Sequence, residues 1–201
     1  MIKVHGITRS RAFRTLWMLE ELGLEYTQVP VDFANDGTHA PAFLKLNPNG
    51  HVPVLEDDGV VLWESMAINL YLAEKHGGAL WPSDVAGRGK AYQWSFWAIT
   101  ETEAPMLELL RHTQTLPPEK RVPEKAAKAL ETLQGPFAVL DSALKPGPFL
   151  LGGEFTVADL NVAAVFSWGR AARADFSAYP ALDAWLTACL GRPARRKASS
   201  R

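Results

Sequence analysis

Hydrophobic and polar positions follow two different patterns along this chain, and the change falls near residue 80. Up to about residue 77, short apolar runs alternate with stretches in which apolar residues recur at helical spacing, which is typical of a β/α unit. Beyond about residue 88 only long helical windows follow. The pattern predicts an α/β domain followed by an all-helical domain.

The first part has the order strand, helix, strand, helix, strand, strand, helix. Strands are predicted over residues 2–4, 26–31, 52–55 and 60–63, and helices over 10–22, 42–46 and 65–76. Gly23 is suited to end the first helix, the polar residues Asn35 to Gly37 precede the second, and Asp58-Gly59 suits a type I′ turn. With a parallel crossover first and a hairpin last, this order resembles a thioredoxin-like fold.

The second part is divided from the first by a stretch rich in Pro, Ser, Asp and Gly. The expected organisation is a thioredoxin-like domain over 1–77, a linker over 78–88 and an all-helical domain over 89–201. Helices are predicted over residues 90–111, 119–143, 156–172 and 180–190. Thr156 and Asp159 form a variant of the capping box. The last ten residues are expected to fray as a basic tail, with Arg192, Arg195, Arg196, Lys197 and Arg201.

Composition narrows the classes of function. Of the 201 residues, 47% are hydrophobic and 21% are charged, which excludes a disordered chain. Because 21 basic residues balance 22 acidic ones and no basic stripe appears, nucleic acid is not expected as a partner. No apolar window is long enough to enter a membrane. The single cysteine, Cys189, excludes an internal disulfide and a cysteine-based metal cage, so we expect a cytoplasmic protein without a metal.

Three places in the first domain could carry chemistry. Ser10 lies between the first strand and first helix, where its hydroxyl caps the helix or serves a ligand. Pro53 is either an edge device or part of a cis peptide that turns the Val52 backbone outward toward an extended peptide. Glu64 and Ser65 begin the third helix, as capping residues or as a pair that holds an amino-acid head group. Each alternative stays open from the sequence.

Four segments together resemble the cytosolic glutathione transferase superfamily, serine type, over nearly the whole chain. They are Ser10-Arg11 with residues 14–23 (RTLWMLEELG), residues 46–55 (LNPNGHVPVL), residues 63–68 (WESMAI) and residues 155–160 (FTVADL). The resemblance implies a glutathione-binding first domain, a helical domain with a pocket for a second substrate, and a homodimer. Glutathione is then a co-substrate, and no further cofactor is implied.

The resemblance also implies roles for individual residues. Ser10 matches the serine that donates a hydrogen bond to the glutathione sulfur, Val52 the residue whose backbone pairs with the cysteinyl portion, and Pro53 the cis proline. Glu64 and Ser65 match the clamp for the γ-glutamyl group. Contacts to the glycyl carboxylate fall to His51, where the family often has Lys or Gln, and to His39 as a second candidate.

The expected chemistry is attack of a glutathione thiolate on a small apolar electrophile. A free thiol has a pKa of about 8.5, so an enzyme working near neutrality must stabilise the thiolate, and Ser10 with the helix amino end could do so. Trp94, Trp97 and Met106 in the first long helix of the second domain are candidates for the electrophile pocket, although an aromatic stripe is also typical of a core. Arg11 and Arg14 are expected to be surface or structural residues.

Two alternatives remain beside this detoxifying transferase. A glutathione-dependent peroxidase or disulfide reductase would use the same thiolate against a peroxide or a disulfide. A non-catalytic binding protein could keep the fold without the reaction. Members of the superfamily that form mixed disulfides place a cysteine at or beside the position of Ser10, whereas Cys189 lies in the last apolar helix. Chemistry through an enzyme cysteine is therefore not expected.

Overall fold

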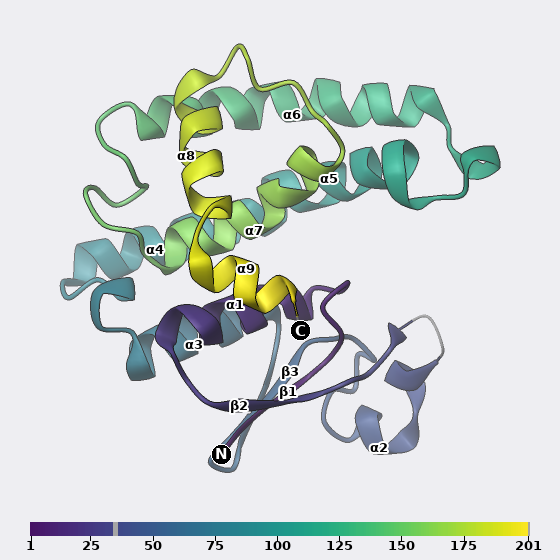
Figure 1. Cartoon of the computed structure of the whole chain (residues 1–201), viewed down its shortest axis with the longest axis vertical. Coiled ribbons are helices and arrows are strands. Elements are labelled where there is room, and N and C mark those ends of the chain that lie inside the picture. The colour runs from purple at the N-terminus through teal and green to yellow at the C-terminus, as the bar shows by residue number, and fades with distance from the viewer. Residues whose placement is uncertain (34–35, 201) are drawn as a thin grey trace. The chain divides into compact units, whose positions relative to one another are not determined.

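The computed structural model describes residues 1–33 and 36–200, and the chain divides into two compact units (Figure 1). Unit 1 contains Met1–Gly78 together with Gly191–Arg201, and unit 2 contains Ala79–Leu190. The last residues of the chain thus group with the first unit, although they follow the helical windows in sequence. Asn35 of the expected polar stretch and Arg201 of the expected tail lie outside the described residues.

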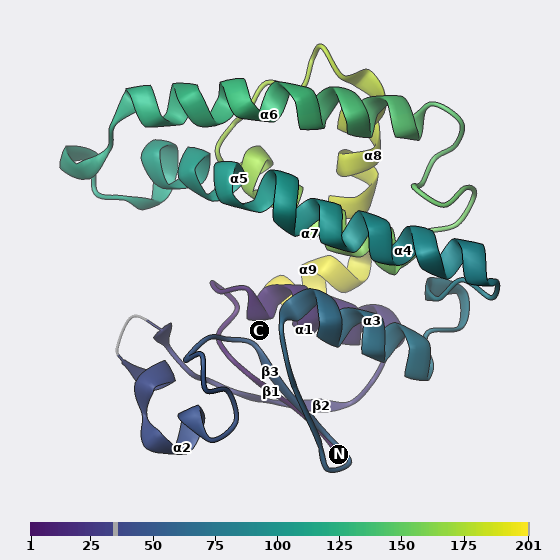
Figure 2. The same ribbon diagram turned by 180° about the vertical axis from the view of Figure 1, so that it is seen from behind.

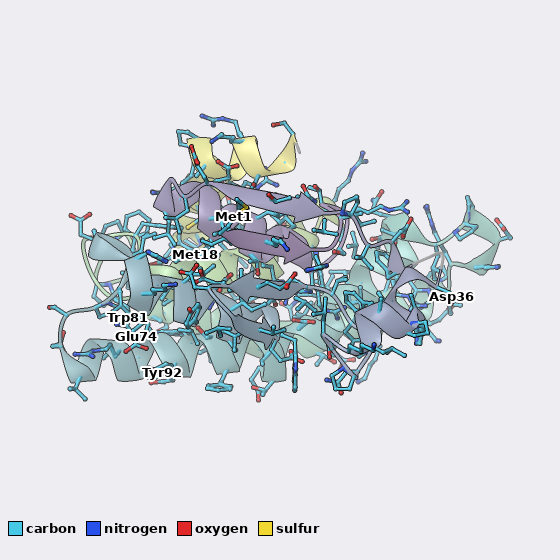
Figure 3. All side chains as sticks on the ribbon, turned by 90° about the horizontal axis from the view of Figure 1, so that it is seen from below. Met1, Met18, Asp36, Glu74, Trp81 and Tyr92 are labelled. Atoms are coloured by element: carbon cyan, nitrogen blue, oxygen red, sulfur yellow. The ribbon has the colours of Figure 1, made fainter. Side chains whose placement is uncertain are left out.

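Unit 1 is built on a four-stranded sheet of order β2-β1-β3-β4. Its strands are β1 (Ile2–His5), β2 (Tyr26–Val29), β3 (Val54–Asp57) and β4 (Val60–Trp63). β1 and β2 are parallel, as predicted, and the other two pairs are antiparallel. Asp58 and Gly59 have φ angles of 48° and 87°, the positive values that the predicted turn requires. Figure 3 shows Met1 and Asp36 toward opposite ends of this sheet.

Helices α1 (Ala12–Leu22) and α3 (Ser65–His76) lie together on one face of the sheet, and the short helices η2 (Gly37–His39) and α2 (Pro41–Leu44) lie on the other side (Figure 1 and Figure 2). Gly23 ends α1 with a φ of 64°, as the sequence predicts. The buried face of α1 packs the apolar side chains of the unit 1 core, among them Leu16, Trp17 and Leu19.

The C-terminal segment is a helix, α9 (Pro193–Ser199), so the expectation of a frayed tail is wrong. α9 runs beside α1, the yellow and purple helices of Figure 1. Arg192 donates two hydrogen bonds to the Glu21 carboxylate, at 2.6 and 2.8 Å, and Lys197 pairs with Glu20 at 2.5 Å. Ala198 is fully buried. These contacts offset the entropy cost of ordering a terminus.

Unit 2 is built of helices joined by loops, with one isolated β-bridge between Phe149 and Gly152 in its described residues. Its helices are η3 (Gly78–Leu80), which spans the boundary between the units, α4 (Val85–Trp97), η4 (Ala98–Thr102), α5 (Glu103–Leu110), η5 (Arg111–Thr115), η6 (Pro118–Lys120), α6 (Pro123–Leu144), α7 (Val157–Ala171) and α8 (Pro180–Leu190). The predicted helix over 90–111 is interrupted by the π-helical turn η4. α7 packs against α4, α5 and α8, and most of its residues are buried. Figure 3 labels Trp81, which precedes α4, and Tyr92, which lies within it; their rings meet edge to face at 5.8 Å.

The capping box at the start of α7 is confirmed. The Thr156 side chain caps the helix, and Asp159 accepts hydrogen bonds from the Thr156 N–H and hydroxyl, both at 3.0 Å. Asp159 also accepts from the Leu150 N–H at 2.8 Å and from Trp185 Nε1 at 2.9 Å. Burial raises the pKa of Asp159 against the lowering effect of these bonds. The Asp159 carboxylate thus joins α7 to α8 and to the loop that precedes α7.

Candidate functional site

Gly6, the residue after β1, brings the start of α1 close to the segment before β3. Its φ is +136°, and a Cβ at this position would lie 2.6 Å from the Ala12 Cβ and 3.2 Å from the Val52 Cβ. Any side chain here would therefore push these two segments apart. This hypothetical Cβ would also lie 3.6 Å from Ser10 Oγ. The absence of a side chain at Gly6 thus lets the Ser10 turn and Val52 both lie close to the end of β1.

Ser10 is half-buried in the turn that leads into α1. Its hydroxyl donates to the Ile7 carbonyl at 2.7 Å and accepts from the Ala12 N–H at 3.1 Å. The Ser10 hydroxyl thus satisfies the N–H of Ala12, the first residue of α1, as a capping side chain does, although Arg11 occupies the N-cap position. Because the hydroxyl has one proton, binding an anion at Ser10 Oγ requires that proton to turn away from Ile7. A charged acceptor favours this exchange, since hydrogen bonds to ions are the stronger ones.

The Val52-Pro53 peptide bond is cis, so of the two alternatives for Pro53 the structure has the cis peptide. Among the described residues, neither the N–H nor the C=O of Val52 has a hydrogen-bond partner. The sheet register pairs His5 with Val54 and Val54 with Trp63. Gly6 follows His5, Pro53 precedes Val54 and Glu64 follows Trp63. Because these strand pairs are antiparallel, the three residues lie at the same end of the sheet.

Glu64 and Ser65 lie where β4 meets α3. Glu64 has φ 73° and ψ 110°, a backbone conformation that costs free energy in a residue with a side chain, and its side chain is exposed. Ser65 is 5% exposed, and its hydroxyl accepts a hydrogen bond from Arg14 Nη1 at 3.3 Å. Asn69 donates to the Arg14 carbonyl at 3.3 Å. Arg14 is thus a buried structural residue that ties the start of α3 to α1.

The two histidine candidates are brought together by the turn before β3. Asn47 is buried, and its side-chain amide donates to the His51 carbonyl at 2.7 Å. A Cβ at Gly50 would lie 3.3 Å from His39 Nε2, so the His39 ring lies against the residue that precedes His51. Both histidines are exposed. They offer ring nitrogens beside the Val52 segment.

The candidates for the electrophile pocket lie in unit 2, and one of them is wrong. Trp94 and Trp97 are partly exposed, with ring centroids 5.1 Å apart, and Trp97 stacks on Phe166 at 6.2 Å. Met106 has no exposed surface, and its sulfur lies 3.0 Å from the position of a Cβ on Gly169. Met106 is therefore a core residue, because the lack of a side chain at Gly169 leaves room for the thioether.

A shallow, open hollow of about 590 Å³ borders the Ser10 turn, and sequence reasoning missed it. Its lining residues come from the segments after β1 and from the end of β2 onward: Ile7, Thr8, Arg9, Gln28, Pro30 and Asp32. The signal was available, since the carboxyl ends of two parallel strands meet at one edge of a sheet.

Over residues 1–33 and 36–200 no cluster of three or more His, Cys, Asp or Glu could hold a metal.

Two family models match the chain. The model described as "Glutathione S-transferase, N-terminal domain" matches residues 1–74, and the model described as "Glutathione S-transferase, C-terminal domain" matches residues 103–193. In the described part of the chain, no helix is long and apolar enough to cross a membrane.

Similar proteins agree with these matches. Glutathione S-transferase GstB of Escherichia coli is 34% identical over 92% of this chain and 90% of its own length. The disulfide-bond oxidoreductase YfcG of the same organism is 31% identical over 98% of this chain and 94% of its own length. A theta class glutathione S-transferase from Xanthomonas axonopodis pv. citri, solved with glutathione bound, has a TM-score of 0.90, 32% identity, and coverage of 100% and 97%.

Proposed function

This chain belongs to the glutathione S-transferase family, and on that premise we propose that Ser10 activates glutathione for transfer to an apolar electrophile. As a member it is a glutathione transferase, with glutathione as its substrate. The observation that carries the finer proposal is the convergence of Ser10, Val52 and Glu64-Ser65 at one end of the sheet. A scaffold without a reaction has no need of all of them.

Each part of glutathione has a matching group at this end of the sheet. The N–H and C=O of Val52, which have no partner among residues 1–33 and 36–200, suit the backbone of an extended cysteinyl residue. The exposed Glu64 carboxylate suits the γ-glutamyl ammonium, and the Ser65 hydroxyl and the amino end of α3 suit its carboxylate. His51 or His39 takes the glycyl carboxylate.

Activation rests on stabilising the anion of the thiol. On binding, the thiol loses its proton to solvent, and the Ser10 hydroxyl turns from the Ile7 carbonyl to the sulfur. The amino end of α1 adds positive potential at the same point. The thiolate then attacks the electrophilic carbon, a C–S bond forms and the leaving group departs with the electron pair. Ser10 forms no covalent intermediate.

Substitution of Ser10 tests this role. Ser10→Ala is expected to raise the pKa of enzyme-bound glutathione and to lower kcat/KM with a nitroaryl chloride about 10- to 100-fold, since a hydrogen bond to a charged group contributes about 1.5–3 kcal/mol. Ser10→Thr keeps the hydroxyl and should keep most of the activity. Unchanged thiol pKa and activity in Ser10→Ala would exclude Ser10 as the sulfur ligand.

Disulfide reduction is the second candidate, favoured by the similarity to the disulfide-bond oxidoreductase YfcG. The same thiolate would attack a disulfide sulfur in place of a carbon and expel one thiolate. A second glutathione thiolate then attacks the mixed disulfide, so that the other thiolate leaves and the two glutathiones are oxidised to glutathione disulfide. Steady-state assays with a nitroaryl chloride, a hydroperoxide and a glutathione-containing mixed disulfide rank the reactions. A kcat/KM at least tenfold higher for the mixed disulfide would replace the transferase reaction as the main activity.

The proposal extends to the compartment and the oligomeric state of the enzyme. We infer a cytoplasmic homodimer, as the resemblance to the cytosolic superfamily implies. A chain with one cysteine, Cys189, forms no internal disulfide, which fits a reducing compartment. Trp94 and Trp97 stay in the proposal as a lining for the electrophile from unit 2. Sedimentation of the full chain measures the oligomeric state directly.

A further inference from the structure

Arg14 joins α1 to the residue at which α3 begins. It lies on α1, after Ser10 in the chain, and is only 2% exposed. Its Nη1 atom donates a hydrogen bond to Ser65 Oγ at 3.3 Å, and its carbonyl accepts one from the Asn69 side chain, also at 3.3 Å. α1 and α3 lie side by side on one face of the sheet (Figure 1). The Arg14 guanidinium is therefore held against the Ser65 hydroxyl.

Ser65 accepts a hydrogen bond from Arg14, which leaves its own hydroxyl proton for another group. A guanidinium has N–H donors and no acceptor, so Ser65 Oγ can only be the acceptor in this bond. Over residues 1–33 and 36–200 the Ser65 hydroxyl donates to no acceptor. Because linked hydrogen bonds polarise one another, the bond from Arg14 also makes the Ser65 O–H a stronger donor.

The start of α3 has further donors at the same place. The first hydrogen bond within α3 runs from the Ile68 N–H to the Glu64 carbonyl. The N–H groups of Ser65 and Met66 come before it and have no acceptor within the helix. Together with the Ser65 hydroxyl they form a set of donors. Such a set suits a carboxylate better than a carboxamide, because the N–H groups of an amide would meet other donors.

We propose that Arg14 is a positioning residue, which directs the Ser65 proton toward the ligand and thereby makes this part of the site select a carboxylate over a carboxamide. The inference rests on the proposed binding of glutathione and adds a residue that sets its specificity. The γ-glutamyl group carries the carboxylate on its α carbon. Arg14 acts through Ser65 and does not contact the ligand itself.

The identity of residue 14 matters because it fixes the direction of one hydrogen bond. A glutamine there has an acceptor oxygen as well as N–H donors, so Ser65 can turn and donate to it. The Ser65 oxygen then faces the ligand with a lone pair, which repels a carboxylate and accepts from an amide N–H. A lysine, like arginine, only donates and keeps the direction.

A purely structural Arg14 would give a different result. Loss of a contact between α1 and α3 lowers the stability of unit 1 and weakens all ligands at this site by a similar factor. Loss of a directed proton weakens the ligand that accepts this proton and spares one that does not. Two ligands of the same shape therefore separate the two roles.

The test uses S-methylglutathione and its α-carboxamide, in which CONH2 replaces the carboxylate of the γ-glutamyl group. Neither has a thiol, so activation by Ser10 does not enter the measurement. Titration calorimetry of the full chain gives the Kd of each ligand. Wild type should prefer the carboxylate, and in Arg14→Gln the ratio of the two Kd values should fall about tenfold, as expected for a hydrogen bond to a charged group. Arg14→Lys should keep the ratio within about threefold of wild type.

The matched control is Asn69→Ala, which removes the hydrogen bond to the Arg14 carbonyl and leaves the guanidinium in place. It should lower the melting temperature of the ligand-free chain and leave the ratio of the two Kd values unchanged. Arg14→Met is a second variant, because methionine has no acceptor oxygen and no N–H donor. Its ratio should fall as well, since nothing then fixes the direction of the Ser65 hydroxyl.

Three results would overturn the role of Arg14: an unchanged ratio in Arg14→Gln and Arg14→Met, a fall in Arg14→Lys as large as in Arg14→Gln, or failure of both uncharged variants to fold where Arg14→Lys folds. The last result would make Arg14 a structural residue. If S-methylglutathione does not bind to wild type at all, the proposed glutathione site itself is wrong, so the two failures are distinguishable.

Discussion

Glu56 shows how one residue on the sheet links stability to pH. It lies on β3 and accepts a hydrogen bond from His5 Nε2 on β1 at 2.7 Å. This bond, with help from the charge of Lys3, holds the pKa of Glu56 below its ordinary value of about 4.5. A carboxylate with a lowered pKa in the folded state stabilises that state above its unfolded pKa. The contribution is lost as the pH falls through the folded pKa.

Substitution of Glu56 tests whether its contribution to stability is lost at low pH. Glu56→Gln is expected to lower the melting temperature at pH 7, because the ionised partner of His5 is removed. The difference from wild type should shrink as the pH falls below about 4.5, where the wild-type carboxylate also becomes protonated. Thermal melts from pH 7 to pH 3 measure it. Glu154→Gln, at an exposed position in unit 2, is the control and should show no such convergence.

Helix α9 shows what a single element contributes. Glu21 on α1 is 6% exposed at its side chain and accepts from Arg192 twice and from Trp17 Nε1 at 2.9 Å. The Cζ atom of Arg195 lies 5.8 Å from the centroid of the Phe13 ring, and Phe13 is three residues after Ser10. α9 therefore packs along α1, the helix that begins two residues after the candidate sulfur ligand, Ser10.

Breaking the main ion pair should loosen this element. Arg192→Met leaves the buried Glu21 carboxylate without its two strongest donors, and we expect a loss of about 1–3 kcal/mol in the free energy of unfolding. Urea unfolding measures this loss. Lys128→Met removes a basic partner from an exposed pair with Glu131, where both side chains are more than 70% exposed, and should change the free energy by less than about 0.5 kcal/mol. Equal effects of the two variants would contradict the role given to α9.

Over the whole molecule, the candidate glutathione contacts gather in unit 1. Ser10, Val52, Glu64 and Ser65 all belong to Met1–Gly78. A ligand that binds only the folded state stabilises that state by mass action, by about 2.7 kcal/mol at a concentration one hundred times its Kd. The proposed function therefore predicts that glutathione protects the unit that contains α1, α3 and the sheet.

Calorimetry of the full chain tests this expectation. Saturating glutathione should raise the melting temperature, and Ser10→Ala should keep most of the rise, because Ser10 is assigned to the sulfur alone. Ser65→Ala should lose much of it, since Ser65 is assigned to the γ-glutamyl carboxylate. S-methylglutathione, which has no thiol proton, should protect both wild type and Ser10→Ala. The absence of any protection in wild type would contradict glutathione binding.

The sequence by itself determined the local elements and the residues at their ends. The order of the strands, the turn at Asp58-Gly59 and the capping box of Thr156 and Asp159 follow from residues a few positions apart, whose spacing and turn chemistry act through near neighbours. The bounds were less exact: the strand predicted over 52–55 is Val54–Asp57, and the one predicted over 26–31 ends at Val29. Ser10 was found in the same way, as a residue between a strand and a helix.

The tertiary structure alone decided how distant residues meet. The partners of Arg192 and Lys197 lie on α1, more than 170 positions away, so a tail that reads as frayed is a docked helix. Met106 is a core residue because Gly169 leaves room for its sulfur. The shallow hollow with Arg9 and Asp32 lies where the two parallel strands β1 and β2 end. Spacing along the chain carries no record of these contacts, since they depend on how separate elements pack.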